Sequence, residues 1–182
     1  MWPLSDEALV TGLALGDEEA ATAFVRRFQA RVFGLALTMV GDRAVAEEIA
    51  QETFLRAWRH AGAYDPRRGR VTTWLLSIAR NVAIDHLRMR RTESIDPDEL
   101  RRRESAMWAQ VDAGEASGEL IDLREALATL PAEQRRALLL AALYGFTARE
   151  VGAIEGSPLG TAKTRIRSGL IKLRESLEET EK

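Results

Sequence analysis

The sequence of 182 residues contains no cysteine, and its only histidines are His60 and His86. The lack of cysteine excludes disulfide bonds, thiolate zinc sites and cysteine nucleophiles, and two histidines are too few for a histidine-rich metal site. The sequence also lacks a glycine-rich phosphate-binding loop, and no Glu-x-x-His motif accompanies Glu47, Glu48 and Glu52. We therefore expect no catalytic site, no metal and no cofactor.

Long hydrophobic runs are absent as well. No apolar run approaches the roughly 20 residues that span a bilayer, and the first residues, Met1 to Glu7, contain no basic stretch followed by an apolar one. Hydrophobic residues make up 46% and charged residues 30% of the chain, a globular balance that excludes wholesale disorder. We expect a cytoplasmic protein without membrane insertion.

Charge of one sign is concentrated in blocks, although the formal net charge of the chain is only −2. Residues 56–91 contain 9 basic and 2 acidic side chains, a net charge of +7, whereas residues 1–55 and residues 92–120 each carry −5. Residues 121–182 carry +1. A strongly basic block within an acidic chain is typical of a surface that binds a polyanion, and an ordinary solvated surface is the alternative.

Apolar residues recur at spacings of three and four along three segments of the first half, which predicts three amphipathic helices and no strand. Gly41 and Asp42 separate the first helix from the second. We expect these helices to form a bundle over roughly residues 17–91. The predicted buried positions are Ala21, Phe24, Val25, Phe28, Val32, Leu35, Ala36 and Met39; Ala46, Ile49, Ala50, Thr53, Phe54, Ala57 and Trp58; and Val71, Trp74, Leu75, Ile78, Ala79, Val82, Ile84 and Leu87.

Residues 92–120 interrupt this pattern with Pro97, two glycines and a large excess of acidic over basic residues. Such a composition predicts a flexible acidic linker. Met107 and Trp108 stand out among its few large apolar residues and are candidates to dock on another surface. Helical patterns resume near Ile121. The expected fold class is therefore all-α, with two small helical domains joined by the linker.

The C-terminal segment has the pattern of a helix-turn-helix, in which a short capped helix and a glycine-containing turn precede a longer helix. Thr147 and Glu150 form a capping box at the first helix, and Ser157-Pro158 marks the start of the second. The predicted buried positions of the second helix are Leu159, Ala162, Ile166, Leu170, Leu173 and Leu177.

The opposite face of this last helix carries residue types that read DNA. Lys163, Thr164 and Arg167 share that face, with Gly160 one turn earlier. A lysine or arginine there suits guanine acceptors in the major groove, and a threonine suits the thymine methyl. An αα-hairpin with a basic exposed face is the alternative. Phosphate oxygens suit the flanking residues, which are Thr161, Arg165 and Ser168.

Two blocks of sequence resemble the extracytoplasmic-function (ECF, group 4) sigma factors of bacterial RNA polymerase. The first block is residues 46–91, AEEIAQETFLRAWRHAGAYDPRRGRVTTWLLSIARNVAIDHLRMRR, and it resembles the family's promoter-melting domain. The second is residues 130–177, LPAEQRRALLLAALYGFTAREVGAIEGSPLGTAKTRIRSGLIKLRESL, and it resembles the second DNA-binding domain. The resemblance implies an N-terminal domain at 1–91, a linker at 92–120 and a C-terminal domain at 121–182.

The family resemblance implies a protein that binds core RNA polymerase, directs it to specific promoters and helps to open the DNA. The family's AEEIAQETFLRAW helix docks on the coiled coil of the polymerase clamp. An exposed leucine framed by carboxylates suits a partly basic partner helix, and a random polar face is the alternative. The residues expected to bind polymerase are Glu48, Gln51, Glu52, Leu55 and Arg59.

The segment that follows resembles the loop and helix that capture the melted minus-ten element. An aromatic side chain and arginines suit a flipped base on a strand that positive charge holds. Asn81 stands where the family has a base-reading asparagine, and its amide offers a donor and an acceptor together. The spacing of Trp74 predicts a core residue rather than a strand-opening wedge. The expected minus-ten residues are Tyr64, Asp65, Arg67, Arg70, Ser77, Arg80, Asn81 and Arg88.

The resemblance also implies the remaining partners. The last helix would recognise the minus-thirty-five element as duplex, the N-terminal domain would hold the minus-ten element as a single strand, and the acidic linker would thread the polymerase cleft. An anti-sigma factor is expected to cover both DNA-binding domains. The protein would lie in the bacterial cytoplasm and join the nucleoid when in holoenzyme.

A free-standing helix-turn-helix repressor or activator is the main alternative function. Such a protein binds its operator duplex without polymerase, usually as a two-fold dimer on a palindrome. The N-terminal bundle would then be a ligand-binding or dimerisation domain. Dependence on polymerase separates the two hypotheses.

Overall fold

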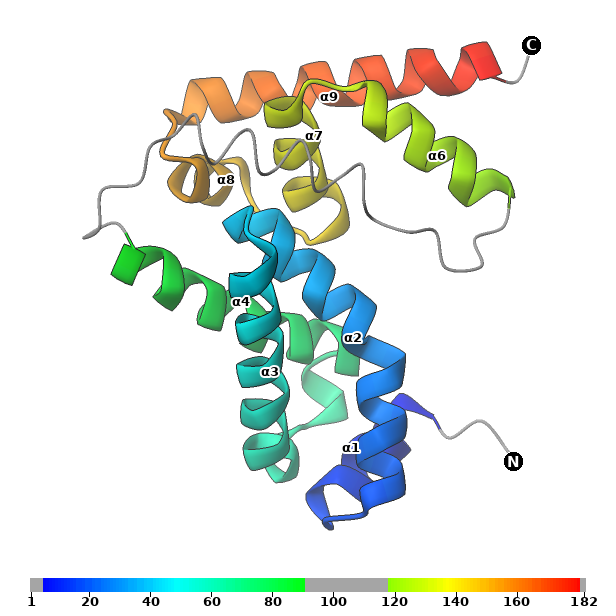
Figure 1. Ribbon diagram of the computed structural model, residues 1–182, viewed down its shortest axis with the longest axis vertical. Coiled ribbons are helices and arrows are strands. Elements are labelled where there is room, and N and C mark those ends of the chain that lie inside the picture. Colours follow the sequence, from blue (N-terminus) through cyan, green and yellow to red (C-terminus); the bar gives the residue numbers. More distant parts are fainter. Residues whose placement is uncertain (1–4, 91–117, 181–182) are drawn as a thin grey trace. The chain divides into compact units, whose positions relative to one another are not determined.

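Helices account for most of the residues that the computed structural model describes, which are 5–90 and 118–180, and no strand occurs among them (Figure 1). The chain divides into an N-terminal unit, Met1–Ser94, and a C-terminal unit, Ile95–Lys182. The expected all-α fold class is confirmed for these residues. Most of the expected linker, including Met107 and Trp108, lies outside the described residues.

The N-terminal unit consists of α-helices and short 3-10 turns. The helices are α1 (Asp6–Ala14), α2 (Glu18–Val40), α3 (Arg43–His60) and α4 (Val71–Arg90), and the turns between α3 and α4 are η1 (Ala61–Ala63) and η2 (Pro66–Arg68).

Side-chain caps and one glycine set the boundary between the long helices. Asp17 accepts a hydrogen bond from the backbone N–H of Glu19 at 2.8 Å, and Asp42 accepts one from Val45 at 3.2 Å. Each such cap contributes about 1 kcal/mol. Gly41 ends α2 with a φ of 67°, a left-handed conformation that glycine adopts without strain. The predicted helix end at Gly41-Asp42 is confirmed.

The core of the N-terminal unit is apolar. Phe24 and Phe28 of α2 are almost fully buried, and their ring centroids lie 4.9 Å apart. Phe54 of α3 packs edge-on against Phe24 with 6.1 Å between the centroids, and Ile49 and Leu75 are also buried. Full burial of one such side chain contributes about 1.5–3 kcal/mol.

One helix of this unit was not expected from the sequence. The predicted bundle begins near residue 17, but α1 precedes it and buries Leu9, Val10 and Leu13. Ser5 caps α1 by accepting a hydrogen bond from the N–H of Ala8 at 3.1 Å. Nine residues contain too few periodic positions for an amphipathic pattern to stand out, which explains why this helix was missed.

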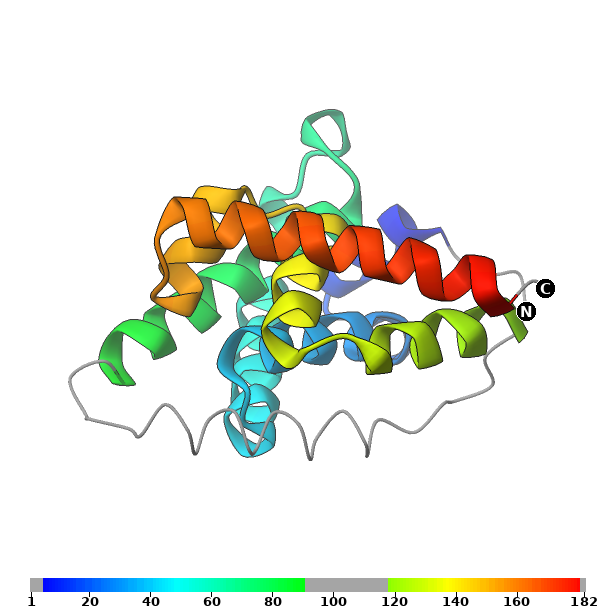
Figure 2. The same ribbon diagram turned by 90° about the horizontal axis from the view of Figure 1, so that it is seen from above.

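The C-terminal unit is organised around one long helix. In both views α6 lies alongside the second half of α9, and α8 packs near its start (Figures 1 and 2). The elements are α6 (Gly118–Thr129), α7 (Ala132–Leu138), the π-helical turn η3 (Leu139–Leu143), α8 (Ala148–Glu155) and α9 (Leu159–Thr180).

The turn between α8 and α9 is tight. The capping box of Thr147 and Glu150 is confirmed at the start of α8, and Gly156 ends that helix with a φ of 66°. A Cβ atom at Gly152 would lie only 2.8 Å from the carbonyl oxygen of Ser157. The predicted N-cap role of Ser157 is wrong, because its buried hydroxyl has no hydrogen-bond partner among the described residues.

The buried stripe of α9 is narrower than the sequence predicts. Ala162 is fully buried, and a Cβ atom at Gly169 would lie 3.0 Å from the backbone oxygen of Gln134 in α7. Close approach through these small residues leaves Leu159 and Leu170 exposed, so their predicted burial is wrong. Among residues 5–90 and 118–180, no helix is both long and apolar enough to cross a lipid bilayer.

Candidate nucleic-acid interface

The exposed face of α3 carries the side chains that the sequence assigns to polymerase binding. Glu48, Gln51 and Arg59 are exposed, and Leu55 is 44% exposed. Glu52 is half-buried. The five expected residues therefore lie on one helix with their side chains accessible.

Trp58 is also exposed on α3, to 56%, which contradicts its predicted place in the buried stripe. The residues that α3 buries are Ala46, Ile49, Thr53 and Ala57, and the predicted burial of these four is confirmed. These mostly small residues let α3 approach its neighbours closely. The helical rotation of 100° per residue then turns Trp58 away from the core.

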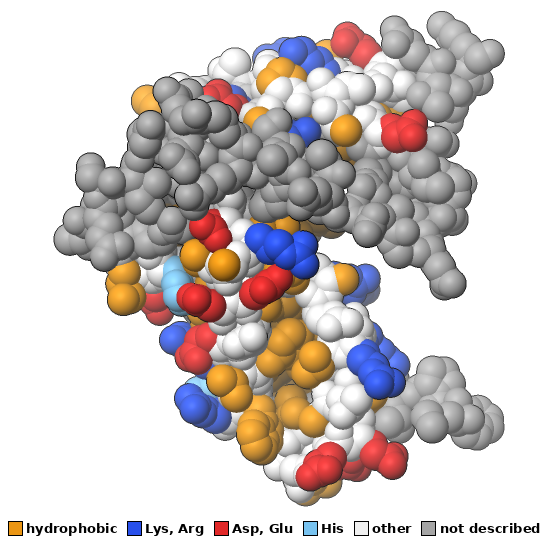
Figure 3. Space-filling model, in the orientation of Figure 1, with side chains coloured by type: hydrophobic (Ala, Val, Ile, Leu, Met, Phe, Trp, Pro, Cys, Tyr) orange, Lys and Arg blue, Asp and Glu red, His pale blue; other side chains and the backbone are white. Residues whose placement is uncertain are grey.

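An apolar groove of about 500 Å³ runs between α2 and α3 (Figure 3). Val25, predicted to be buried, is partly exposed in this groove, and that prediction is wrong. Arg43 and Glu47 form an ion pair at the edge of the groove. The groove is lined by Val25, Gln29, Ala30, Phe33, Arg43, Glu47, Ala50, Gln51 and Phe54.

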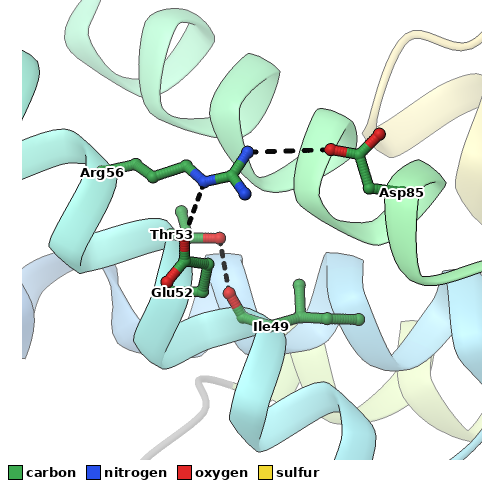
Figure 4. Close-up of polar contacts among 5 residues, drawn as sticks. All are labelled: Ile49, Glu52, Thr53, Arg56 and Asp85. Carbon is green, nitrogen blue, oxygen red and sulfur yellow. Dashed lines mark hydrogen bonds and ion pairs between the residues drawn. The ribbon is translucent and has the colours of Figure 1, made fainter.

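Arg56 connects α3 to α4 (Figure 4). Its Nε donates to Oε1 of Glu52 at 2.7 Å, and its guanidinium lies 3.8 Å from Oδ2 of Asp85 on α4. The hydrogen bond from Arg56 lowers the pKa of the Glu52 carboxyl. Next to this pair, the buried hydroxyl of Thr53 donates to the carbonyl oxygen of Ile49 at 2.6 Å.

The loop between α3 and α4 holds its own aromatic and acidic residues in place. The Tyr64 hydroxyl donates to the Gly69 carbonyl oxygen at 3.0 Å, and the Tyr64 ring lies 5.3 Å from that of Trp74. Burial raises the pKa of Tyr64. The sequence assigns Tyr64 to base stacking, whereas the half-buried ring packs on Trp74. Trp74 is itself half-buried rather than a full core residue.

The carboxylate of Asp65 organises the short turn η2. It accepts hydrogen bonds from the backbone N–H of Arg67 at 3.0 Å and from the guanidinium of Arg67 at 2.9 and 3.0 Å. The guanidinium hydrogen bonds hold the pKa of Asp65 below its ordinary value. Arg67 keeps an exposed side chain, and Arg70 is exposed as well.

One face of α4 is polar and accessible. Ser77, Asn81 and Arg88 are exposed, as the sequence predicts, and Arg80 is half-buried. The Ser77 hydroxyl donates to the carbonyl oxygen of Trp74 at 2.6 Å. The opposite face is buried and consists of Val71, Leu75, Ala79, Val82 and Ala83.

The corresponding face of α9 is accessible too. Lys163, Thr164 and Arg167 are exposed together, as the sequence predicts. The Thr164 hydroxyl donates to the carbonyl oxygen of Gly160 at 2.9 Å. Of the expected flanking residues, Thr161 is exposed and Ser168 is half-buried.

Arg165 departs from the sequence-based assignment. The sequence places it among the phosphate-contacting residues, but its side chain is only 21% exposed and is turned into the C-terminal unit. One guanidinium nitrogen donates to Oε2 of Glu155 at 2.8 Å and the other to Oε2 of Glu133 at 2.5 Å. No local sequence pattern predicts the contact with Glu133, because Glu133 is 32 positions away from Arg165.

The surroundings of Glu155 explain the need for this arginine. The side chain of Glu155 is 5% exposed, and burial raises the pKa of its carboxyl, although the hydrogen bond from Arg165 acts in the opposite direction.

Within the described parts of the chain, no group of three or more His, Asp or Glu side chains is arranged to hold a metal ion.

Comparison with known proteins relates both units to one family. Residues 24–93 match the family described as Sigma-70 region 2, and residues 120–173 match Sigma-70, region 4. The chain is 38% identical over 162 residues to the ECF RNA polymerase sigma factor RpoE of Cereibacter sphaeroides, covering 88% of each chain. It is 32% identical over 175 residues to the ECF RNA polymerase sigma factor SigK of a Mycobacterium species, covering 94% of this chain and 90% of that one.

Solved structures of similar proteins include SigE of Rhodobacter sphaeroides in complex with the anti-sigma ChrR. That chain is 30% identical, and the match covers 92% of this chain and 98% of that one with a TM-score of 0.47.

Proposed function

Because this chain belongs to the ECF sigma factors of RNA polymerase, and thus to a family of transcription initiation factors, we propose that it recruits core polymerase to specific promoters. We place it in group 4 of the sigma factors and assign it no catalytic chemistry of its own. It would act in the bacterial cytoplasm and associate with the nucleoid when in holoenzyme. The observation that carries the proposal is the pair of accessible polar faces on α4 and α9, described above.

Core polymerase would bind α3 and the neighbouring groove. Leu55 and Trp58 are large apolar side chains exposed among Glu48, Gln51, Glu52 and Arg59, a composition typical of protein interfaces. The adjoining groove between α2 and α3 offers further apolar surface. A partly basic helix of the polymerase clamp has the complementary chemistry.

The minus-ten element would bind α4 and the preceding loop as a single strand. The exposed amide of Asn81 can donate to and accept from one base. Arg67, Arg70, Arg80 and Arg88 supply positive charge for the backbone of that strand. Tyr64 and Asp65 contribute by holding the loop in shape.

The minus-thirty-five element would bind α9 as duplex, with α8 and α9 acting as a helix-turn-helix. Lys163, Thr164 and Arg167 would read base edges in the major groove. Thr161 and Ser168 would contact phosphates beside them. Promoter opening then follows from differential binding, because the protein holds the separated minus-ten strand more tightly than the duplex.

An anti-sigma factor is the proposed regulator. Such a partner would cover the exposed apolar side chains of α3 and the basic faces of α4 and α9. A relative, SigE of Rhodobacter sphaeroides, is described in complex with an anti-sigma. Affinity purification from the native host should recover a small co-transcribed protein together with polymerase. Recovery of polymerase alone, under conditions where transcription by this factor is off, would count against the regulator.

Run-off transcription with purified core polymerase tests the proposed function. The template is DNA selected by the holoenzyme, and the variant is Leu55→Asp, which places a charge on the exposed face of α3. Transcription should require the protein, and Leu55→Asp should abolish both transcription and co-purification with core polymerase. The matched control is Leu15→Asp, because Leu15 is also exposed but lies after α1.

The opposite result identifies the alternative function. If core polymerase ignores the protein while the protein alone shifts duplex DNA, the chain is a free-standing repressor or activator. The N-terminal unit would then need another explanation.

A further inference from the structure

Arg165 links the proposed recognition helix α9 to the two helices α7 and α8. It lies in the second turn of α9 and donates to Glu155, the last residue of α8, and to Glu133, in the first turn of α7. The distances are 2.8 and 2.5 Å. A planar guanidinium can direct two N–H groups at two separate carboxylates, which the single ammonium of lysine cannot do in a fixed geometry.

The carboxylate of Glu155 depends on this arginine. Its side chain is 5% exposed, and its Oε1 has no hydrogen-bond partner among the described residues. It also stands at the C-terminal end of α8, where the helix dipole disfavours negative charge. Removal of Arg165 from this position to reach a DNA phosphate would leave Glu155 buried without its hydrogen-bond donor.

We propose that Arg165, held by Glu155 and Glu133, is a positioning residue that fixes the orientation of α9 and so determines the sequence-specific part of minus-thirty-five recognition. The inference rests on the proposed function of α9. Lys163, Thr164 and Arg167 lie on the accessible face of the same helix. A change in the helix angle moves these side chains relative to the base edges, while phosphate contacts adapt more easily.

The two possible roles of Arg165, positioning α9 or contacting a phosphate, predict different effects on DNA binding when either glutamate is replaced by glutamine. If Arg165 contacts phosphate, Glu133→Gln and Glu155→Gln free its guanidinium and strengthen binding to any DNA. If Arg165 positions α9, the same substitutions loosen the helix and weaken only the preference for the correct sequence. Both substitutions keep the size of the side chain, and Glu133 is partly exposed, so at least this variant keeps the fold.

The experiment measures holoenzyme binding to a promoter duplex with an intact or a scrambled minus-thirty-five element over a series of salt concentrations. The variants are Glu133→Gln, Glu155→Gln and Arg165→Lys, each checked by circular dichroism. We expect each variant to lower the ratio of intact to scrambled affinity by about tenfold, the scale of one lost base contact. The slope of log affinity against log salt should stay unchanged. The matched control is Arg174→Lys, because Arg174 pairs with Glu178 on the exposed part of the same helix.

Other outcomes are equally decisive. Arg165→Lys could instead weaken binding to both DNAs equally, or the two glutamine variants could bind both DNAs more strongly. Either result, with a changed slope of log affinity against log salt, identifies a phosphate contact and overturns the inference. A wild-type preference that all three variants keep also overturns it and leaves the proposed function intact. A wild-type holoenzyme without any preference for the intact element overturns the proposed function itself.

Discussion

Arg56 in the N-terminal unit and Arg165 in the C-terminal unit each contact two carboxylates. Arg56 contacts Glu52 of its own helix and Asp85 of α4, whereas both partners of Arg165 lie on other helices. The Arg56 side chain is 37% exposed and reaches Asp85 only at 3.8 Å. Arg165 is 21% exposed, and its partner Glu155 is 5% exposed. Water screens the ion pairs of Arg56, so they add little stability. Loss of Arg165, in contrast, would leave the carboxylate of Glu155 buried without a partner cation.

The difference reflects how each unit is built. The N-terminal unit has a core of large apolar side chains such as Phe24, Phe28 and Met39, so its polar links can remain at the surface. The C-terminal unit packs α9 through small residues such as Ala162 and Gly169. Its helices are held in addition by the partly buried ion pairs of Arg165 with Glu155 and Glu133. Mutations should therefore destabilise the two units by different mechanisms.

The largest effect is expected from the apolar core of the N-terminal unit. Phe28→Ala should lower the free energy of unfolding of this unit by about 3–5 kcal/mol, because a cavity replaces a fully buried ring. Chemical denaturation followed by the fluorescence of Trp58 and Trp74 measures the change. Val25→Ala serves as a control, because Val25 is partly exposed and should cost far less. Equal losses for the two variants would contradict this account of the core.

The second effect concerns the partly buried ion pairs of Arg165 in the C-terminal unit. Arg165→Ala should lower the free energy of unfolding of that unit by about 3 kcal/mol, because Glu155 remains buried without its donor. Denaturation followed by the amide signals of α8 and α9 in NMR spectra reports on this unit alone. Arg174→Ala, which breaks an exposed pair, should have almost no effect. A comparable loss in both variants would show that burial of these ion pairs is unimportant.

A smaller effect is the pH dependence that Glu155 contributes. Burial raises the pKa of its carboxyl above the ordinary value of 4.5, so the folded state binds the proton more tightly than the unfolded state. The stabilising contribution is therefore complete below pH 4.5 and is lost as the pH rises through the raised pKa. The unfolding free energy of wild type minus that of Glu155→Gln should therefore decrease as the pH rises through that window. A difference that grows with pH would show that the pKa is lowered instead.

The smallest effect is expected at the surface link. Arg56→Gln removes the hydrogen bond to Glu52 and the contact with Asp85. The melting temperature should not change measurably, since exposed ion pairs contribute little. The pKa of Glu52 should rise toward its ordinary value, because the hydrogen bond from Arg56 is the main cause of its lowering. A large drop in melting temperature would place Arg56 in the same class as Arg165.

The sequence predicts the features that depend on neighbouring residues. The helix end at Gly41-Asp42, the capping box at Thr147 and the accessible face with Asn81 follow from local patterns and are confirmed. Periodicity alone failed where helices pack through small residues, since it placed Trp58 and Leu170 in the core.

The sequence did not predict contacts between distant segments. Arg165 is a basic residue on a helix that was expected to bind DNA, so the sequence suggests a phosphate contact. Nothing in the sequence of that helix predicts its ion pair with Glu133 in α7. Tyr64 similarly has the residue type of a stacking group, and only the fold shows its contact with Trp74. Residue types therefore indicated the kind of interface, whereas the side chains that support it became evident only from the packing.

Run-off transcription on a matrix of protein and promoter variants tests the division of labour between α4 and α9 most directly. The proteins are wild type, Asn81→Ala and Lys163→Ala/Arg167→Ala, and the promoters carry substitutions in the minus-ten or the minus-thirty-five element. Asn81→Ala should lose discrimination at the minus-ten element only, and the double variant should lose it at the minus-thirty-five element only. Loss of discrimination at both elements in each variant, or at neither, would contradict the assignment of one promoter element to each unit.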